Sequence, residues 1–298
     1  MSREREKLTG IYPATITPFT GEGKINEGAM KELISRNIGE GAKGVFIGGS
    51  SAECFLLTPE ERKRIFEIAS DFKGRTTLIA HVGAISTGQA VGYALYAKEL
   101  GFDMIAATPP FYYGFDSRSV AGYYYDIYEA SGMPVLIYNF PGNTGREFNL
   151  SDPVYQELFK SPAILGVKHT NQVVYQLERI KHLNPNLIVF NGFDETMVAG
   201  LALGADGSVG STFNFMLPHY KKIFDSYKKK EWEQALELQI KANNIMNALC
   251  DVGLIPAIKY VLTTQGIDAG DPRKPFYPLT PDARAYVDRA VKENLVTE

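Results

Sequence analysis

The chain has 298 residues, 45% of them hydrophobic, and a formal net charge of −3. This length suits one large domain with an appendage, and the lack of a basic excess argues against nucleic acid as a partner. The two cysteines and four histidines do not have metal-ligand spacing. We therefore expect a reducing compartment and no bound metal.

The N-terminal seven residues are mostly charged and polar, and no apolar stretch follows them. This pattern argues against a secretory signal peptide. No apolar run along the chain approaches the ~20 residues that a membrane helix requires. We therefore expect a cytoplasmic protein that has no membrane partner.

In the first half of the chain, short apolar runs alternate with longer helical patterns. Five strands are expected here, over residues 11–16, 45–47, 77–82, 103–107 and 134–138. The pattern predicts four helices, over residues 26–40, from Thr58 onward, and over 87–100 and 117–131. The second helix has the clearest start, because Thr58 can cap it, Pro59 suits its first position and Glu61 completes a capping box.

The alternation continues through three more expected strands, at residues 163–168, 187–190 and 207–209. Helices are expected at residues 151–160 and 173–183, with a short one after Asp194. Eight strand–helix units predict an α/β fold, a (β/α)8 TIM barrel, which we assign to residues 1–225. A doubly wound open sheet is the alternative, but no GxGxxG motif follows the first strand.

The C-terminal part, residues 226–298, has a helical pattern throughout. Helices are expected from about residue 231, over residues 254–265 and over residues 281–295. In the first of these, Trp232, Leu236, Ile240 and Leu249 fall near one face. We expect an all-helical C-terminal domain that packs on the barrel.

A lysine at the end of the sixth strand is the first candidate for chemistry. Five apolar or small residues, 163–167, precede Lys168. A buried lysine is costly unless it is paired or used, and an amine removed from water can attack a ketone to form a Schiff base. A lysine that reaches solvent just past the strand is the structural alternative.

Active sites of such barrels lie at the carboxyl ends of the strands, so the residues that follow each strand are further candidates. After the second strand, Ser50 and Ser51 could hold a carboxylate, or could form an ordinary Gly/Ser turn. Tyr138 ends the fifth strand and could transfer a proton, or could be a core tyrosine. Asp194 and Glu195 suit polyol hydroxyls, and they also suit a helix N-terminus.

Other strand ends contribute Tyr112, Thr170 and Ser211. An exposed tyrosine pair such as Tyr112 and Tyr113 often forms an oligomer contact. One lysine with hydroxyls and carboxylates on a single rim favours a binding site. Without a metal constellation, a lysine-dependent aldolase is favoured over a metal-dependent one.

Four motifs resemble the class I aldolase family that contains N-acetylneuraminate lyase and dihydrodipicolinate synthase. They are the Gly-Gly-Ser-Ser-x-Glu loop at 48–53, Tyr138-Asn-x-Pro141, Gly166-x-Lys168 and Arg273-Lys-Pro-Phe276. The resemblance covers nearly the whole chain. It implies a (β/α)8 barrel with a C-terminal helical domain, usually in a homotetramer, and a reaction that needs no cofactor or metal.

The resemblance also implies roles for individual residues. Lys168 would form the Schiff base with the pyruvate unit, and Tyr138 would be the general acid/base, helped by the Ser51 hydroxyl. Ser50 and Ser51 would bind the pyruvate carboxylate. Tyr112 falls where the family places a tyrosine that is lent across a dimer interface to the neighbouring site.

Within the family, the lyase branch that acts on sialic acid fits best. Its pattern would use five residues to contact the sugar's hydroxyl-bearing chain, namely Thr170, Gly192, Asp194, Glu195 and Ser211. The synthase branch carries an arginine after the strand-5 tyrosine, where this chain has Asn143; Arg146 lies three residues further on. The expected small-molecule partners are therefore a sugar acid and pyruvate.

Other functions remain open at this point. A 2-keto-3-deoxy sugar-acid aldolase and a dihydrodipicolinate synthase-like enzyme would use the same lysine. A catalytically silent sugar-acid sensor would keep the pocket and lose the chemistry. A phosphosugar isomerase would require a phosphate loop after strands 7 and 8. Residues 207–211 are a weak candidate for that loop, because Asp194 and Glu195 would repel a phosphate.

Overall fold

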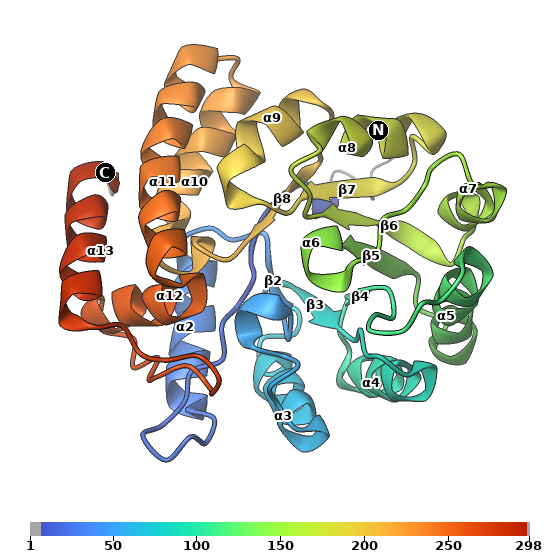
Figure 1. The fold of residues 1–298 in the computed structure, drawn as a ribbon, viewed down its shortest axis with the longest axis horizontal. Coiled ribbons are helices and arrows are strands. Elements are labelled where there is room, and N and C mark those ends of the chain that lie inside the picture. Colours follow the sequence, from blue (N-terminus) through green and yellow to red (C-terminus); the bar gives the residue numbers. More distant parts are fainter. Residues whose placement is uncertain (1–6, 297–298) are drawn as a thin grey trace. The chain divides into compact units, whose positions relative to one another are not determined.

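Eight short parallel strands alternate with helices in a computed structural model that describes residues 7–296 (Figure 1). The strands are β1 (Gly10–Pro13), β2 (Gly44–Ile47), β3 (Thr77–His81), β4 (Met104–Ala107), β5 (Val135–Asn139), β6 (Ile164–His169), β7 (Ile188–Asn191) and β8 (Gly207–Gly210). Their order in the sheet is β1-β8-β7-β6-β5-β4-β3-β2. This order confirms the predicted (β/α)8 barrel, and each strand lies within a few residues of its predicted position.

Helices follow the strands, as the sequence predicts. They are α2 (Glu27–Gly39), α3 (Pro59–Ser70), α4 (Thr87–Leu100), α5 (Ser117–Ser131), α6 (Pro141–Thr144), α7 (Pro153–Lys160), α8 (Val174–Leu183), α9 (Met197–Ala202), α10 (Phe213–Lys228), α11 (Trp232–Val252), α12 (Leu254–Thr264) and α13 (Pro281–Asn294). Two short 3₁₀ turns, η1 (Ser50–Ala52) and η2 (Asp194–Thr196), complete the described elements. The capping box of α3 forms as predicted: the Thr58 hydroxyl accepts from Glu61 N, and the Glu61 carboxylate accepts from Thr58 N.

The chain forms two compact units. Residues 7–9 and 72–209 make up unit 1, and residues 10–71 and 210–296 make up unit 2. The strands of unit 1 pair in register, so that Ile137, Val167 and Val189 lie side by side on β5, β6 and β7, and all three are fully buried. Each such side chain contributes roughly 1.5–3 kcal/mol to stability. This packing fixes the strand ends that follow.

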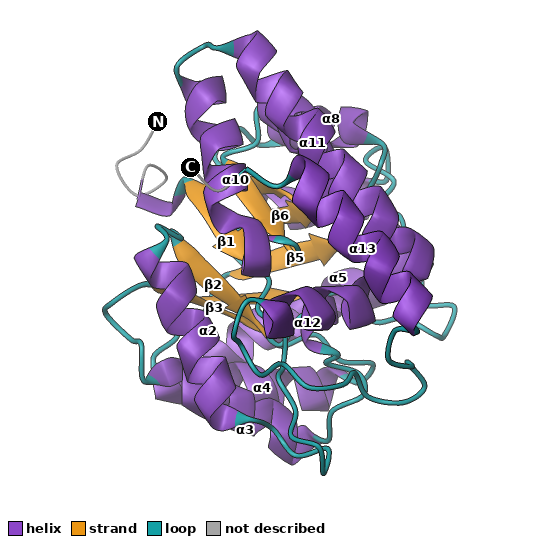
Figure 2. Cartoon of the chain, turned by 90° about the vertical axis from the view of Figure 1, so that its left-hand side faces the viewer, coloured by secondary structure: helices purple, strands orange, loops and turns teal. Residues whose placement is uncertain are grey.

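Unit 2 contains β1, β2, α2, α3 and the helices α10 to α13. Within it α11 packs against α10, α12 and α13, as Figure 2 illustrates for the helices drawn in purple. The C-terminal region is therefore helical as predicted. The proposed division between residues 225 and 226 remains a prediction.

The predicted apolar face of α11 is wrong in part. Trp232, Leu236 and Ile240 are about half exposed, whereas Leu249 is fully buried. The helix instead buries a set that starts at Ala235 and continues through Leu238, Ala242 and Ile245. Small residues such as alanine carry little weight in a hydrophobic pattern, so the larger side chains suggested the wrong face.

Within residues 7–296, no single helix has the length and hydropathy needed to cross a bilayer. The pair α11 and α12 meets that criterion only jointly, with a bend of 116° between them.

Candidate active site

Unit 1 places Lys168 and Tyr138 opposite each other on neighbouring strands. The two residues are register partners in the β5–β6 pair, and each side chain is 3% exposed. The Lys168 Nζ atom lies 3.9 Å from the centre of the Tyr138 ring. Lys168 is thus buried at its strand end, so the predicted burial is confirmed and the solvent-reaching alternative is wrong.

Aromatic rings surround this pair. The His81 ring meets the Tyr138 ring edge-on, with centroids 5.6 Å apart. The Phe140 ring stacks on the Tyr138 ring, with centroids 5.7 Å apart. Phe193, before η2, packs edge-on against Phe140. The site around Lys168 therefore has an apolar wall, which lowers the local dielectric and strengthens polar contacts made there.

Glycines allow the strands near Lys168 to come close. A Cβ atom at Gly166 would lie 1.9 Å from the Ile188 carbonyl oxygen, so the Gly166-x-Lys168 motif has a steric cause. A Cβ at Gly192 would lie 1.9 Å from the Thr170 hydroxyl. Gly192 thus leaves room for the Thr170 side chain at the end of β6.

Thr170 is 4% exposed, and its hydroxyl has no hydrogen-bond partner among the described residues. Its backbone N–H donates to Asn139 O at 2.8 Å, which ties it to the end of β5. A buried hydroxyl without a partner costs free energy that a bound ligand could recover. Thr170 is therefore a well-placed candidate for a substrate contact.

A polar network lies behind the two strand ends. The Asn139 amide nitrogen lies 3.1 Å from His169 Nδ1 and donates to Gln176 Oε1 at 3.2 Å. His169 Nε2 lies 3.2 Å from Val173 O. Burial lowers the pKa of His169 to about 4, so this imidazole is neutral at physiological pH. A neutral ring can accept from Asn139 and donate to Val173 at once.

The acidic pair follows β7 as predicted. Asp194 is 2% exposed at the start of η2, and Glu195 is half-buried beside it. Burial, followed by repulsion from Asp194, raises the pKa of Glu195. Carboxylates held in this way can accept hydrogen bonds from hydroxyls. Both residues also lie at the start of a helical turn, so the alternative role at a helix N-terminus is met as well.

In unit 2, Ser50 and Ser51 form the 3₁₀ turn η1 directly after β2. Both are half-buried. Ser211, also half-buried, directly follows β8. Each of the three serines therefore stands at the carboxyl end of a strand, where barrel enzymes carry their ligand contacts.

Tyr112 differs from the other predicted site residues because it is exposed. Its side chain is 83% exposed and its backbone has φ = 75°. A tyrosine in this left-handed conformation is strained, and such strain persists only where other contacts enforce it. The Arg146 guanidinium supplies such contacts, since it donates to Phe115 O at 2.5 Å and to Tyr113 O.

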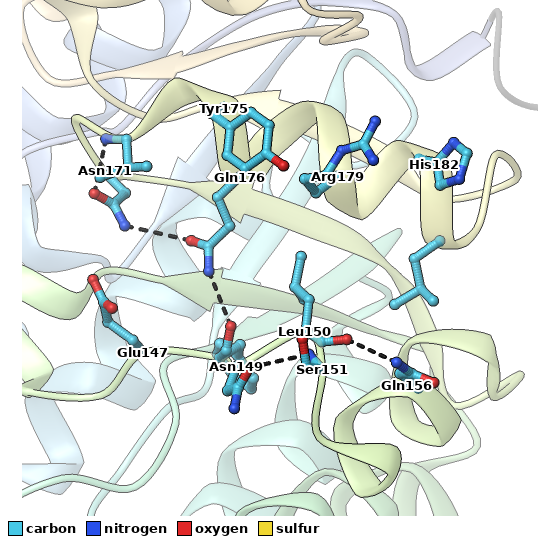
Figure 3. A pocket seen from close by; sticks show the side chains of 13 residues that line it. Glu147, Asn149, Leu150, Ser151, Gln156, Asn171, Tyr175, Gln176, Arg179 and His182 are labelled. Carbon is cyan, nitrogen blue, oxygen red and sulfur yellow. Dashed lines mark hydrogen bonds between the residues drawn. The ribbon is translucent and has the colours of Figure 1, made fainter.

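A separate cavity of about 650 Å³ lies in unit 1 between residues 147–156 and α8 (Figure 3). It contains none of the predicted site residues, although Asn171, Gln176 and Arg179 line it. Gln176 donates to Phe148 O at 3.0 Å and accepts from Asn171 and Asn139. Through Gln176 and Val173, which contact Asn139 and His169, the cavity lies behind the ends of β5 and β6. We do not assign the substrate to it.

Several residues around the candidate site were not predicted. They are His81, Phe140 and Phe193 of the aromatic wall, and the Asn139–His169–Gln176 network. Glu53 belonged to a predicted motif but had no assigned role. The last position of β3 could have pointed to His81, because it follows the same strand-end rule as Lys168.

The comparisons with known proteins agree with this fold. The Dihydrodipicolinate synthetase family matches residues 7–294, and the chain belongs to this family. A curated relative, the N-acetylneuraminate lyase of Rhizobium meliloti, is 40% identical over 271 residues, which cover 91% of this chain and 90% of the relative.

Solved structures of similar proteins cover almost all of the chain. CdNal of Clostridium difficile, solved in complex with mannosamine, is 37% identical with a TM-score of 0.92, over 96% of this chain and 99% of that one. The N-acetylneuraminate lyase of Fusobacterium nucleatum, complexed with pyruvate, is 36% identical with a TM-score of 0.91, over 98% of both chains. The chain is therefore similar over almost its whole length to N-acetylneuraminate lyases.

Proposed function

We propose that this chain is a class I aldolase that cleaves N-acetylneuraminate to pyruvate and N-acetylmannosamine. The observation that carries the proposal is the buried pair of Lys168 Nζ and the Tyr138 ring, 3.9 Å apart. An amine and a phenol in this arrangement supply the two groups that imine-based aldol cleavage requires.

The reaction begins at the ketone of the open-chain sugar acid. The Lys168 amine adds to C2, and loss of water gives an iminium. Tyr138 takes the proton of the C4 hydroxyl as the C3–C4 bond breaks, and the electron pair of that bond moves into the iminium to form an enamine. The aldehyde leaves, Tyr138 returns a proton to C3, and water releases pyruvate from Lys168. The imine supplies the activation, so this route requires no cofactor or metal.

We assign the pyruvate carboxylate to Ser50 and Ser51, which follow β2. We assign the extension of the Tyr138 proton path to the Ser51 hydroxyl and to the phenol of Tyr112, the latter lent by a neighbouring subunit. The sugar's hydroxyl-bearing chain is assigned to Thr170, Gly192, Asp194, Glu195 and Ser211. The hydroxyl of Thr170, which lacks a partner among the described residues, supports this assignment for one of the five.

The contacts of the Arg146 guanidinium favour a sugar acid as the substrate over the second substrate of a dihydrodipicolinate synthase. Its guanidinium donates to two backbone carbonyls, of Tyr113 and Phe115, and lies over the Phe115 ring. Asn143, at the position of the synthase arginine, has no charge to offer a second carboxylate. The relatives from Rhizobium meliloti and Fusobacterium nucleatum are N-acetylneuraminate lyases, which supports the same choice.

We further propose that the chain works in the cytoplasm as a homotetramer. The exposure of Tyr112, together with its enforced left-handed backbone, fits a residue that is lent to the site of a neighbouring subunit. Tyr113, beside it, is also exposed, and the two rings meet edge-on at 5.0 Å. Such an exposed aromatic pair is typical of interface anchors.

The test is pyruvate release from N-acetylneuraminate, measured in parallel with release from 2-keto-3-deoxygluconate. We expect a higher kcat/KM on N-acetylneuraminate. A higher value on 2-keto-3-deoxygluconate would contradict the assigned substrate while preserving the lysine chemistry. Pyruvate binding without release of an aldehyde from either sugar acid would favour a sensor.

A further inference from the structure

The 3₁₀ turn η1 ends at a strained residue. Glu53, its C-cap, has φ = 58° and ψ = 33°, a left-handed conformation that is unusual for a glutamate. Its side chain is fully buried. The turn that carries Ser50 and Ser51 is therefore followed at once by a residue that other contacts have to hold in place.

An ion pair within unit 2 holds that residue. Glu53 Oε1 lies 2.8 Å from Lys259 Nζ of α12, and the two side chains are 0% and 1% exposed. Glu53 Oε2 accepts from the backbone N–H of Arg273 at 2.7 Å. Both carboxylate oxygens are thus occupied by groups from the C-terminal region.

Further contacts reach the same turn from other elements. The Thr17 hydroxyl donates to Ala52 O at 2.8 Å. The Arg273 guanidinium donates to Leu56 O at 3.3 Å and pairs with Glu61 at the start of α3. The residues on both sides of Glu53 are therefore bonded to the loop after β1 and to the C-terminal segment, and Glu53 lies between these contacts.

Lysine 259 is also held by groups other than Glu53. Its Nζ donates to Asp271 O at 3.2 Å and lies 3.9 Å from the centre of the Phe19 ring. Burial lowers the pKa of Lys259 to about 8, against the charges of Glu53 and Asp271, which raise it, while the positive charge of Arg273 lowers it. The ammonium is therefore retained at neutral pH at a desolvation cost.

A buried ion pair is weak evidence for a stabilising role, because well-packed apolar residues often serve stability as well. The proposed mechanism does not use either charge. The position of Glu53 at the end of η1, with Lys259 bound to it, suggests a different purpose.

We propose that the Glu53–Lys259 ion pair positions η1 for binding of the pyruvate carboxylate, so that Glu53 and Lys259 are positioning residues through which the C-terminal helices set the affinity for pyruvate. This proposal rests on the proposed function, in which Ser50 and Ser51 hold that carboxylate. The pair acts through the backbone of the turn and touches no reacting atom.

The test measures the trapping of pyruvate on the whole protein with borohydride, as a function of pyruvate concentration. The variants are Glu53→Gln and Lys259→Met, each of which removes one charge and keeps the approximate shape. We expect the half-saturating pyruvate concentration to rise about 10-fold, on the scale of a lost hydrogen bond to a charged group. The maximal trapping rate should stay within about 3-fold, because the lysine and tyrosine chemistry is intact.

The exposed pair of Lys221 and Asp225, 3.1 Å apart on α10, provides the matched control. Lys221→Met should leave the half-saturating concentration unchanged, because exposed pairs contribute little. An unchanged half-saturation in folded Glu53→Gln and Lys259→Met would overturn the proposal. So would a fall in maximal rate with no change in half-saturation. If the unaltered protein traps no pyruvate, the proposed function fails instead.

A pH series on the wild-type protein and Lys259→Met tests the same pair and does not depend on Glu53→Gln folding. Lys259 loses its charge as the pH rises through about 8. The ratio of the half-saturating concentrations, Lys259→Met over wild type, should therefore fall from about 10 at neutral pH toward about 1 well above pH 8. The ratio cancels titrations that both proteins share. A ratio that stays constant across this range would contradict the proposal.

Discussion

Two buried lysines serve different ends because their neighbours differ. Lys168 and Lys259 are 3% and 1% exposed, and the Nζ atom of each lies 3.9 Å from the centre of an aromatic ring. The ring beside Lys168 is a tyrosine, whose hydroxyl can exchange a proton. Lys259 lies against a phenylalanine and pairs with the carboxylate of Glu53. A proton-transferring neighbour suits an amine that reacts, whereas a fixed anion suits an amine that holds structure.

The strands and helices that carry the two lysines reinforce this difference. Lys168 ends a parallel strand, with the stiff β5 and β7 beside it, so its position is set by the sheet. Lys259 lies inside α12 and reaches a residue far away in the sequence. Burial alone therefore does not identify a catalytic lysine, and the neighbouring side chains decide its role.

The largest expected effect comes from replacing each of the two lysines. We expect Lys168→Ala to abolish pyruvate release from N-acetylneuraminate, since no other group in the mechanism forms the imine. Lys259→Met should retain turnover at saturating substrate. Steady-state kinetics on both variants measure the difference. If Lys259→Met is the inactive variant and Lys168→Ala is not, the assignment of the two lysines is reversed.

The next largest effect is expected at Tyr138. Tyr138→Phe removes the proton-transferring hydroxyl but keeps the ring beside Lys168, so kcat should fall by on the order of 10²-fold or more while borohydride still traps pyruvate. Tyr175→Phe, at an exposed tyrosine of α8, is the matched control. An unchanged kcat in Tyr138→Phe would remove this residue from the mechanism.

A smaller effect is expected where the sugar chain binds. Thr170→Val replaces a buried hydroxyl by a methyl group of similar size, so KM for N-acetylneuraminate should rise about 10-fold through one lost hydrogen bond. The half-saturating concentration of pyruvate should not change, because pyruvate lacks the sugar chain. Equal weakening of pyruvate and sugar acid would instead indicate a structural role for Thr170.

The smallest effect concerns the stability of the Lys168 strand in acid. His169 has a pKa of about 4 in the folded protein against an ordinary value of 6.5, so the unfolded chain takes up this proton at higher pH. The free energy of unfolding should therefore fall as the pH drops from 6.5 toward 4, by on the order of 1–2 kcal/mol at pH 5. Urea unfolding at several pH values measures this slope.

The matched variants for that measurement are His169→Gln and His182→Gln. The first should flatten the slope between pH 6.5 and 4, and the second should not, because His182 is exposed. A slope that persists unchanged in His169→Gln would assign the acid sensitivity to other groups.

Most of the fold could be predicted from the sequence because its signals are local. The Thr58–Glu61 capping box and the apolar run before Lys168 each lie within a few adjacent residues, and both structures form as predicted. The short α6 was missed, because a four-residue helix leaves no periodic pattern. The 3₁₀ turn of Ser50 and Ser51 was expected only as a loop.

The candidate site was predictable to the extent that strand ends reveal it. Lys168, Tyr138 and Thr170 all follow this rule. The Glu53–Lys259 pair was not predictable, because it joins residues from distant parts of the chain and neither has a local pattern. The partners of Arg146 were not predictable either: its sequence position left a contact with a second carboxylate open, whereas its guanidinium binds the backbone carbonyls of Tyr113 and Phe115.

The most direct test of the central claim is the mass of the protein after treatment with pyruvate and borohydride, followed by identification of the labelled peptide. We expect one reduced pyruvyl group per chain, located on Lys168, and no label in Lys168→Ala. Label on Lys259, or no label on the wild-type protein, would contradict it.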